Sequence, residues 1–362
     1  MSLARLDGTA RLGLGLAAIG RPGYITLGRE RDLPAERTVE ALRARSHELL
    51  DAAYERGVRY FDVARSYGRA EEFLASWLVD KPNAIVGSKW GYTYVAGWRV
   101  DAEVHERKDH SVATFERQRA ETRALLGGRL DLYQIHSVTP ESSALSDAAL
   151  HRRLAALAAE GVTIGLSVSG PGQGAAIEAA LGVEVDGVPL FRAVQATWNL
   201  LEPSAGPALA AAHEAGLTVI VKEALANGRL TGAGRSGVMG AGGSGLAGAE
   251  RSGVMGAGRS RLTGAGRSGA AGSAAPPEVT GVAAVAAVAA ELDVPIDAVA
   301  LAAVLQRPWV DVVLSGAVTI GQLDDNWRAL AVHPKMPEMR RLDGVAEPAD
   351  VYWRTRSALP WQ

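Results

Sequence analysis

The sequence feature that most constrains the fold is a recurring alternation of short apolar segments with helical patterns. Such alternation predicts a parallel sheet, and eight units predict a closed (β/α)8 TIM barrel. A doubly wound open sheet is the alternative, but no G-x-G-x-x-G follows the first strand. The expected strands are Leu12–Leu16, Val58–Phe61, Ala84–Ser88, Leu130–Ile135, Val162–Leu166, Ala193–Val194, Leu217–Val221 and Asp311–Leu314. The expected helices are Ser46–Arg56, Ala70–Val79, Ser111–Leu126, Asp147–Glu160, Gly174–Leu181, Pro207–Ala215 and Val299–Gln306.

Two insertions interrupt this pattern in what is otherwise predicted to be a single domain, residues 1–362. Residues 90–110 carry aromatic side chains and both signs of charge, which is typical of a long loop over a pocket at the C-terminal face of the barrel. Residues 229–276 form a Gly-rich repeat with a period of sixteen residues, marked by Arg235, Arg251 and Arg267. Too few apolar residues occur in each unit to bury a face, so the repeat is expected to be a flexible insertion. The alternative is a mobile flap over a phosphate-bearing ligand.

Composition excludes several classes of function. A net charge of -2 over 362 residues offers no basic face for nucleic acid. The absence of cysteine excludes disulfides and thiolate catalysis. The N-terminus lacks the apolar core of a signal peptide, and the most apolar run, residues 281–305, is interrupted by acids and a proline. We therefore expect a cytoplasmic protein without a membrane span, and no metal site.

Polar residues stand where the predicted strands end, which is the face where barrel enzymes place their active sites. Asp62, Lys89 and His136 follow three successive strands, and Tyr67 comes five positions after Asp62. Each residue alone has an ordinary structural explanation, such as a helix cap or a packed surface side chain. Together they supply a phenol as proton donor, an ammonium that lowers its pKa, a carboxylate that orients the ammonium and an imidazole for a carbonyl oxygen. This set predicts that an oxygen is protonated while hydride reaches carbon.

At this point the chain resembles the aldo-keto reductase superfamily. The resemblance rests on FDVARSYG, IVGSKW, LDLYQIH, IGLSVS, VQATWNLLE, ALANGRLTG and LSGAVTIGQLDDN, in the family's order. It implies reduction of an aldehyde or ketone to an alcohol, or the reverse, with Tyr67 as general acid tuned by Lys89 and Asp62 and with His136 orienting the carbonyl. It further implies cofactor contacts from Ser167, Gln195, Glu223, Leu225, Gly228, Ser315, Gly316, Ala317, Val318, Thr319, Gln322, Asp325 and Asn326.

The family's cofactor is NADPH, which the resemblance implies here, with NADH as the alternative. Val168 stands where the family often has asparagine, and Lys222 with Glu223 where an aromatic residue commonly stacks on the nicotinamide. Gln322 replaces an arginine that many members use for the 2′-phosphate. The predicted site therefore departs from the family pattern on its cofactor side.

The expected partner is a small carbonyl or sugar-like substrate, and the sequence does not predict the oligomeric state. Trp90, Trp98 and Trp198 are candidates for the walls of its pocket, although they could equally pack loops onto the barrel. A second hypothesis is a cofactor-sensing regulatory subunit with little turnover, as in the potassium-channel β subunits of the superfamily. The complete set of Asp62, Tyr67, Lys89 and His136 favours an enzyme.

Overall fold

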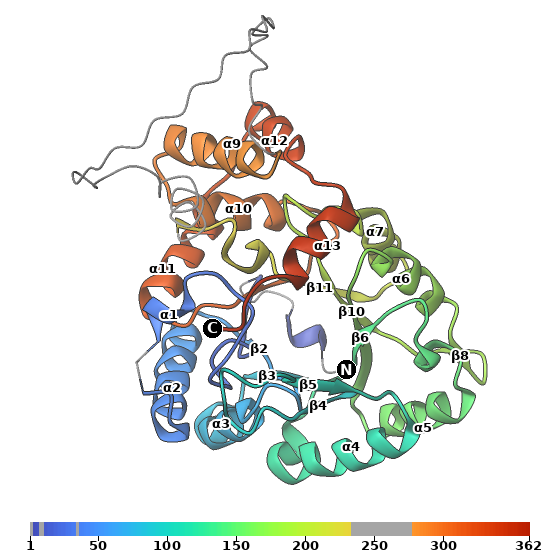
Figure 1. Cartoon of the computed structure of the whole chain (residues 1–362). Coiled ribbons are helices and arrows are strands. Elements are labelled where there is room, and N and C mark those ends of the chain that lie inside the picture. The colour runs from blue at the N-terminus through green and yellow to red at the C-terminus, as the bar shows by residue number, and fades with distance from the viewer. Residues whose placement is uncertain (1–2, 7–10, 34–35, 233–276) are drawn as a thin grey trace, which may run out of the picture.

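The computed structural model describes residues 3–6, 11–33, 36–232 and 277–362. Parallel strands close into a barrel in the order β1-β12-β11-β10-β7-β6-β3-β2, with helices around the outside (Figure 1). The predicted (β/α)8 TIM barrel is therefore confirmed. Its strands are β1 Leu12–Gly15, β2 Tyr60–Asp62, β3 Ile85–Trp90, β6 Leu132–Val138, β7 Thr163–Val168, β10 Ala193–Thr197, β11 Thr218–Lys222 and β12 Val312–Ser315.

The helices of the barrel alternate with its strands in the chain. They are α2 Val39–Glu55, α3 Ala70–Trp77, α4 Val112–Leu126, α5 Ala148–Ala159, α6 Gln173–Leu181, α7 Gly206–Glu214, α10 Ile296–Leu305 and α11 Ile320–Arg328. Further helices are α1 Arg29–Asp32, α9 Pro277–Glu291, α12 Met336–Asp343 and α13 Ala349–Ser357. Short 3-10 turns lie at Leu3–Leu6, Leu78–Asp80, Gly127–Arg129, Ser143–Leu145, Ala226–Gly228 and Ala329–Ala331.

One layer of side chains fills the barrel below the polar strand ends. Tyr60 is its largest member, and its hydroxyl donates a hydrogen bond to Asp62 Oδ2 at 3.1 Å. The ring fits because β3 has Gly87 beside it: a Cβ there would lie 2.1 Å from the Tyr60 hydroxyl oxygen. The layer consists of Tyr60, Ile85, Leu132, Ala193, Ile220 and Val312. It closes the barrel with apolar groups, so ligands are confined to the opposite end.

Helix α2 is longer than its apolar spacing predicts. It begins at Val39 rather than at Ser46, after an N-cap at Thr38 whose hydroxyl accepts a hydrogen bond from Ala41 N at 3.1 Å. Leu42 is fully buried in this added part, but charged neighbours conceal the helical period in the sequence. A Thr cap compensates for the weak pattern, because it satisfies an otherwise unpaired N–H group.

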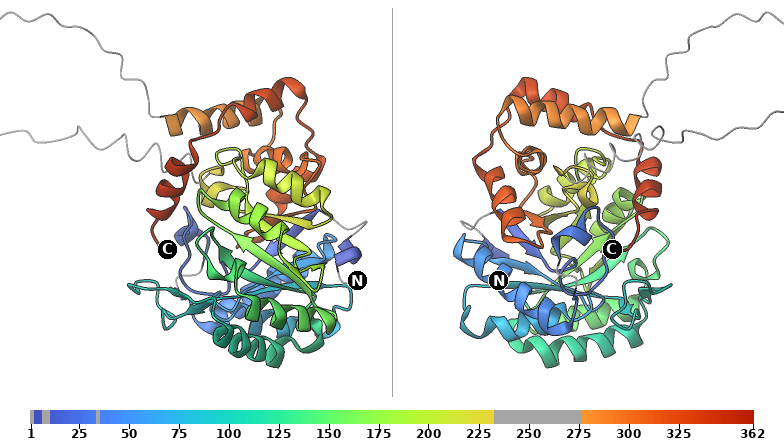
Figure 2. Two further views of the ribbon diagram at one scale, coloured as in Figure 1. Left: turned by 90° about the vertical axis from the view of Figure 1, so that its right-hand side faces the viewer. Right: turned by 60° about the vertical axis from the view of Figure 1, so that its left-hand side comes forward.

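The insertion at residues 90–110 contains an antiparallel hairpin that the sequence pattern did not predict. Its strands, β4 Tyr92–Tyr94 and β5 Glu106–Lys108, project beside the C-terminal segment (Figure 2). His105 stacks on Trp361 with ring centroids 3.8 Å apart, which fixes the hairpin against the chain end. A smaller hairpin joins β8 Glu184–Val185 to β9 Val188–Pro189.

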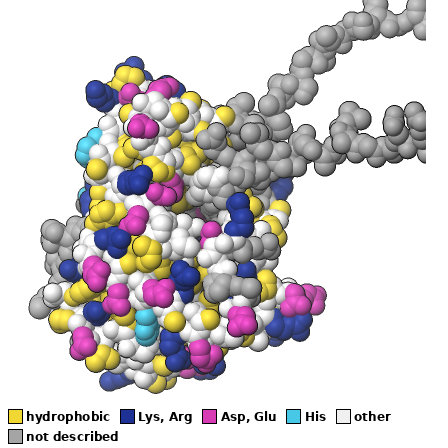
Figure 3. All heavy atoms as spheres, turned by 90° about the vertical axis from the view of Figure 1, so that its left-hand side faces the viewer, with side chains coloured by type: hydrophobic (Ala, Val, Ile, Leu, Met, Phe, Trp, Pro, Cys, Tyr) yellow, Lys and Arg dark blue, Asp and Glu magenta, His cyan; other side chains and the backbone are white. Residues whose placement is uncertain are grey.

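Most of the predicted repeat, residues 233–276, lies outside the described residues. The single-domain assignment and the flexible or flap-like repeat therefore stay predictions. Within the described ranges, no helix has the length and apolar character needed to cross a membrane. On the face shown in Figure 3, side chains of both charge signs are interspersed.

Candidate active site

The C-terminal strand ends open into a cavity of about 930 Å³. Asp62, Tyr67, His136 and Gln195 line this cavity, and Lys89 lies behind Asp62 with 1% of its surface exposed. Residues from the ends of several strands therefore meet, as the sequence predicts for the C-terminal face of a barrel. The volume is at the upper end of the range of about 300–1,000 Å³ for small-ligand sites.

Asp62 connects the other polar groups. One carboxylate oxygen accepts from Lys89 Nζ, and the other accepts from Gln195 Nε2 at 2.9 Å and from Tyr60 at 3.1 Å. Lys89 Nζ also donates to Val63 O at 3.1 Å and lies 4.8 Å from the centroid of the Tyr67 ring. Burial lowers the pKa of Lys89, while the adjacent carboxylate opposes that shift. The pair thus holds an ammonium beside the phenol.

Tyr67 is held by the turn after β2. Its backbone N–H donates to Ala64 O and its carbonyl accepts from Ala70 N, both at 3.0 Å. Gly20 packs so closely that a Cβ there would lie 2.6 Å from the Tyr67 carbonyl oxygen. Burial and the charge of Asp62 raise the pKa of Tyr67 well above its ordinary value, and Arg21 opposes them only in part. This corrects the expectation of a lowered phenol pKa: the group is a protonated donor over the physiological range.

His136 is a neutral imidazole at the cavity wall. Burial lowers its pKa well below the ordinary value, and the positive charges of Lys89 and Lys222 add to this shift. Its ring meets the Tyr67 ring edge-on at 5.5 Å between centroids, and Ser66 Oγ lies 3.4 Å from Nδ1. A neutral imidazole next to a phenol offers a hydrogen bond to a ligand oxygen without adding charge.

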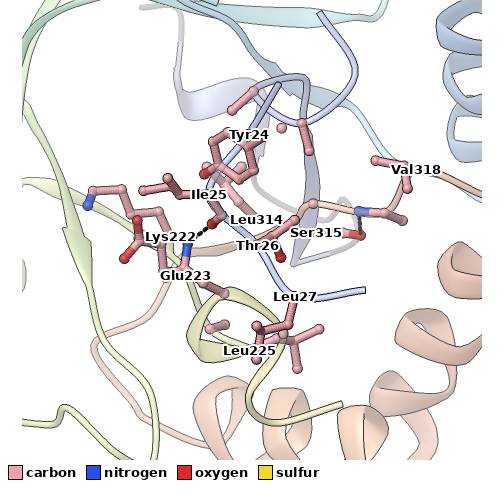
Figure 4. A pocket seen from close by; sticks show the side chains of 18 of the residues that line it. Tyr24, Ile25, Thr26, Leu27, Lys222, Glu223, Leu225, Leu314, Ser315 and Val318 are labelled. Atoms are coloured by element: carbon pink, nitrogen blue, oxygen red, sulfur yellow. Dashed lines mark hydrogen bonds between the residues drawn. The ribbon is translucent and has the colours of Figure 1, made fainter. Parts of the chain in front are cut away.

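The loop after β12 forms a second part of the wall. Ser315, Gly316, Ala317 and Val318 line the cavity together with Gln322, Asp325 and Asn326. Ser315 Oγ accepts from Asn326 Nδ2 at 2.8 Å and from Ala317 N at 3.3 Å (Figure 4). Thr319 instead caps α11 by accepting from Gln322 N, and it does not line the cavity.

The segment after β11 supplies the facing wall, on which Figure 4 shows Lys222, Glu223 and Leu225. Glu223 has a positive φ of 54° and forms a two-pronged ion pair with Arg356 of α13. Burial opposes its ionisation, but Arg356 and Lys222 outweigh burial and lower the pKa of Glu223 to about 2. Gly228 also lines the cavity. Ten of the predicted cofactor residues, on the two segments after β11 and β12, thus line the same cavity as the catalytic set.

Several predicted contacts are not at the cavity. Ser167 is fully buried, and its Oγ accepts from Ser137 N at 2.8 Å. Trp90 is fully buried against Phe115, Trp198 packs edge-on against Trp309, and Trp98 donates to Arg37 O at 2.7 Å. None of these tryptophans is among the lining residues, because each ring is used to pack loops and helices onto the barrel.

Other side chains line the cavity that sequence reasoning did not assign to it. They come from the loop after β1 and the β4–β5 hairpin, and they include Arg21, Tyr24, Asp32 and Glu106. Arg21 lies over the Tyr67 ring at 5.2 Å and pairs with Glu106 at 2.7 Å. In this loop, the Arg21-Pro22-Gly23 sequence is typical of a turn but does not indicate a role at the cavity.

Comparison with known proteins agrees with this geometry. The sequence matches the aldo/keto reductase family over residues 11–347. The chain belongs to that family. Its members are oxidoreductases that act on carbonyl groups with nicotinamide cofactors. No curated protein matches the sequence.

Solved structures show the same fold in other members of the aldo-keto reductases. PA4992 from Pseudomonas aeruginosa, a proposed aldo-keto reductase, superposes with a TM-score of 0.55 at 20% identity, covering 89% of this chain and 91% of its own. A second proposed aldo-keto reductase structure from that organism gives 0.55 at 18% identity, with 89% and 90% covered. At these identities the likeness concerns the fold alone.

Proposed function

We propose that this aldo/keto reductase interconverts an aldehyde or ketone with its alcohol, with Tyr67 as the general acid and base. The observation that carries the proposal is the single carboxylate of Asp62, which joins Lys89 and Gln195 beside the Tyr67 ring. No simpler structural role needs a buried ammonium, a phenol and an imidazole at one cavity wall. Burying an ion pair is costly, so its presence here supports a chemical role.

In reduction, the Tyr67 hydroxyl donates its proton to the substrate oxygen. The raised pKa keeps that proton in place until a negative charge develops on the oxygen. Lys89, held by Asp62, then stabilises the phenolate, and neutral His136 donates a hydrogen bond that orients the carbonyl. In oxidation the same groups act in reverse.

Unpaired hydrogen-bond acceptors in the cavity wall support binding of a nicotinamide dinucleotide. Among the described residues, Gln195 Oε1, Asn227 Oδ1 and Asn326 Oδ1 are buried without a hydrogen-bond partner, and all three residues line the cavity. Amide oxygens left unpaired in this way are costly unless a ligand donates to them, as carboxamide and adenine amino groups do. When bound, the cofactor supplies or accepts the hydride. Gln195 would hold its carboxamide, and Ser315 to Val318 with Asn326 its adenosine side.

The contacts of Gln322 bear on the choice between the two cofactors. Its Oε1 accepts from Val318 N at 2.9 Å, and its Nε2 donates to Asp32 Oδ2 at 2.7 Å. The side chain is therefore committed within the protein, and it places the Asp32 carboxylate at the cavity wall. A carboxylate repels a 2′-phosphate and accepts from a 2′-hydroxyl. Arg31 also lines the cavity, but it is exposed, and solvent weakens its attraction for a 2′-phosphate. The contacts of Asp32 therefore support NADH over the NADPH that the resemblance implies.

A Tyr67→Phe variant tests the proposed reaction. Loss of the proton donor should lower kcat by about 10²–10⁴-fold, while cofactor affinity and thermal unfolding stay near those of the wild type. Tyr133→Phe is the matched control, because Tyr133 is also a buried phenol but does not line the cavity. Aldehyde-dependent oxidation of NADH or NADPH that is unchanged in Tyr67→Phe would refute the mechanism. Cofactor binding without turnover would instead favour the regulatory subunit.

A further inference from the structure

Lys222 is a cation at the cavity wall that the proposed reaction does not use. It ends β11, and its side chain lines the same cavity as Asp62 and His136 (Figure 4). The Nζ atom donates to Thr197 Oγ1 at 2.8 Å and lies 6.0 Å from the centroid of a Trp353 ring. Among the described residues, no carboxylate lies within 4.0 Å of this ammonium.

The nearby acids are already engaged with other cations. Glu223 holds Arg356 with both carboxylate oxygens and accepts from the Thr197 hydroxyl at 3.1 Å. Asp62 already accepts hydrogen bonds from Lys89, Gln195 and Tyr60. Lys222 is therefore a positive charge without its own counter-ion, next to the groups that would meet a substrate carbonyl.

The electrostatics of the site show the cost of this arrangement. Burial lowers the pKa of Lys222 to about 8, although the Glu223 charge partly opposes that shift. The other charged groups that face it are Arg356 from α13 and Lys89 from β3, which lower its pKa further, and Asp62 from β2, which raises it. An anion bound beside the ammonium would offset the free-energy cost of burying the charge of Lys222, because a paired buried charge is far less costly than an unpaired one.

We infer that Lys222 binds a carboxylate of the substrate, so that the preferred substrates are carbonyl compounds that also carry a carboxylate group. This inference rests on the proposed function. A carboxylate carries one negative charge, which matches the one positive charge of Lys222. A phosphate dianion fits less well, because Glu223 and Asp62 flank the position and Arg356 is neutralised by its pair with Glu223. Trp353, next to the ammonium, offers an apolar surface for the rest of the substrate.

A pair of aldehydes that differ in one charge tests the inference on the full-length enzyme. We expect the wild type to show a kcat/KM about ten- to a hundredfold higher for 4-carboxybenzaldehyde than for its methyl ester, methyl 4-formylbenzoate. In Lys222→Met this ratio should fall to about one. In Lys222→Arg, which keeps the charge, the ratio should stay above about five. A wild-type ratio near one, or a ratio that survives in Lys222→Met, would overturn the assignment.

A binding measurement keeps the test independent of turnover. Calorimetry should give tighter binding of 4-carbamoylbenzoate than of its methyl ester, and the difference should disappear as the pH rises through and beyond 8, where Lys222 loses its proton. If neither aldehyde is reduced but this binding difference is present, the proposed reaction fails and the carboxylate site stands. If Lys222→Met leaves the binding difference intact and instead changes the ratio of NADH to NAD⁺ affinity, the ammonium acts on the cofactor and the inference is wrong.

Discussion

The ion pair between Glu223 and Arg356 links the end of β11 to α13, and removing its charge should measurably destabilise the protein. The Glu223 side chain is 7% exposed, and its pKa falls from the ordinary 4.5 to about 2. That shift corresponds to about 3 kcal/mol of stability at neutral pH. Glu223→Gln keeps the shape but leaves Arg356 without its counter-ion, so we expect a loss of about 3 kcal/mol.

Urea unfolding followed by tryptophan fluorescence measures this loss. Because the folded-state pKa is lowered, the stabilisation is present above the unfolded pKa and is lost as the pH falls from about 5 toward 2. The difference between wild type and Glu223→Gln should therefore shrink over that range. Glu291→Gln is the matched control, because Glu291 makes a similar two-pronged contact with Arg341 on an exposed surface. Loss of this contact should destabilise the protein much less than Glu223→Gln, because solvent-exposed ion pairs contribute little to stability. Equal effects of the two substitutions, or a pH-independent difference, would refute the reasoning.

Three further predictions concern the cavity. Asp32→Asn should tighten NADPH binding about three- to tenfold and leave NADH binding little changed, which fluorescence titration would measure; an equal change for both cofactors would contradict a role at the 2′ position. The pKa of His136 is lowered well below 6.5, so His136 should contribute no ionisation near 6.5 to the pH profile of kcat/KM. An ionisation near 6.5 in the wild type that is absent in His136→Gln would contradict this. Gly20→Ala should destabilise the fold by about 1–3 kcal/mol and lower kcat, because the added Cβ would lie 2.5 Å from Ala70 Cβ and displace Tyr67. Urea unfolding that is unchanged in this variant would show that the loop accommodates the methyl group without cost.

The barrel and the meeting of Asp62, Lys89 and His136 could be predicted because they depend on local patterns. A buried parallel strand is a short apolar run, and the residue that follows it must lie at the C-terminal face. The pKa of Tyr67 could not be predicted in the same way. It depends on how deeply the phenol is buried and on the balance between Asp62 and Arg21, which only the folded arrangement provides.

The part of the cavity wall that follows β1 could not be predicted from the sequence, because this loop has no periodicity. Asp32 reaches Gln322 across 290 positions, and nothing in either segment marks the contact. The tryptophans were misleading for a related reason: large rings serve both pockets and packing, and Trp90 is used for packing. Lys222 was visible as a departure from the family pattern, but its missing counter-ion became evident only when the partners of Glu223 were known.

The chain end has a consequence for how substrate preference can change. Tyr24 and Gln362 exchange two backbone hydrogen bonds of 3.0 Å, and Ile25 pairs with Trp361 in an antiparallel bridge. Both segments border the cavity, and the bonds named here join main-chain atoms. The side chains at positions 24 and 25 can therefore be exchanged for others while these main-chain bonds keep the border closed. Selection for a new substrate could alter this wall one residue at a time without first loosening it.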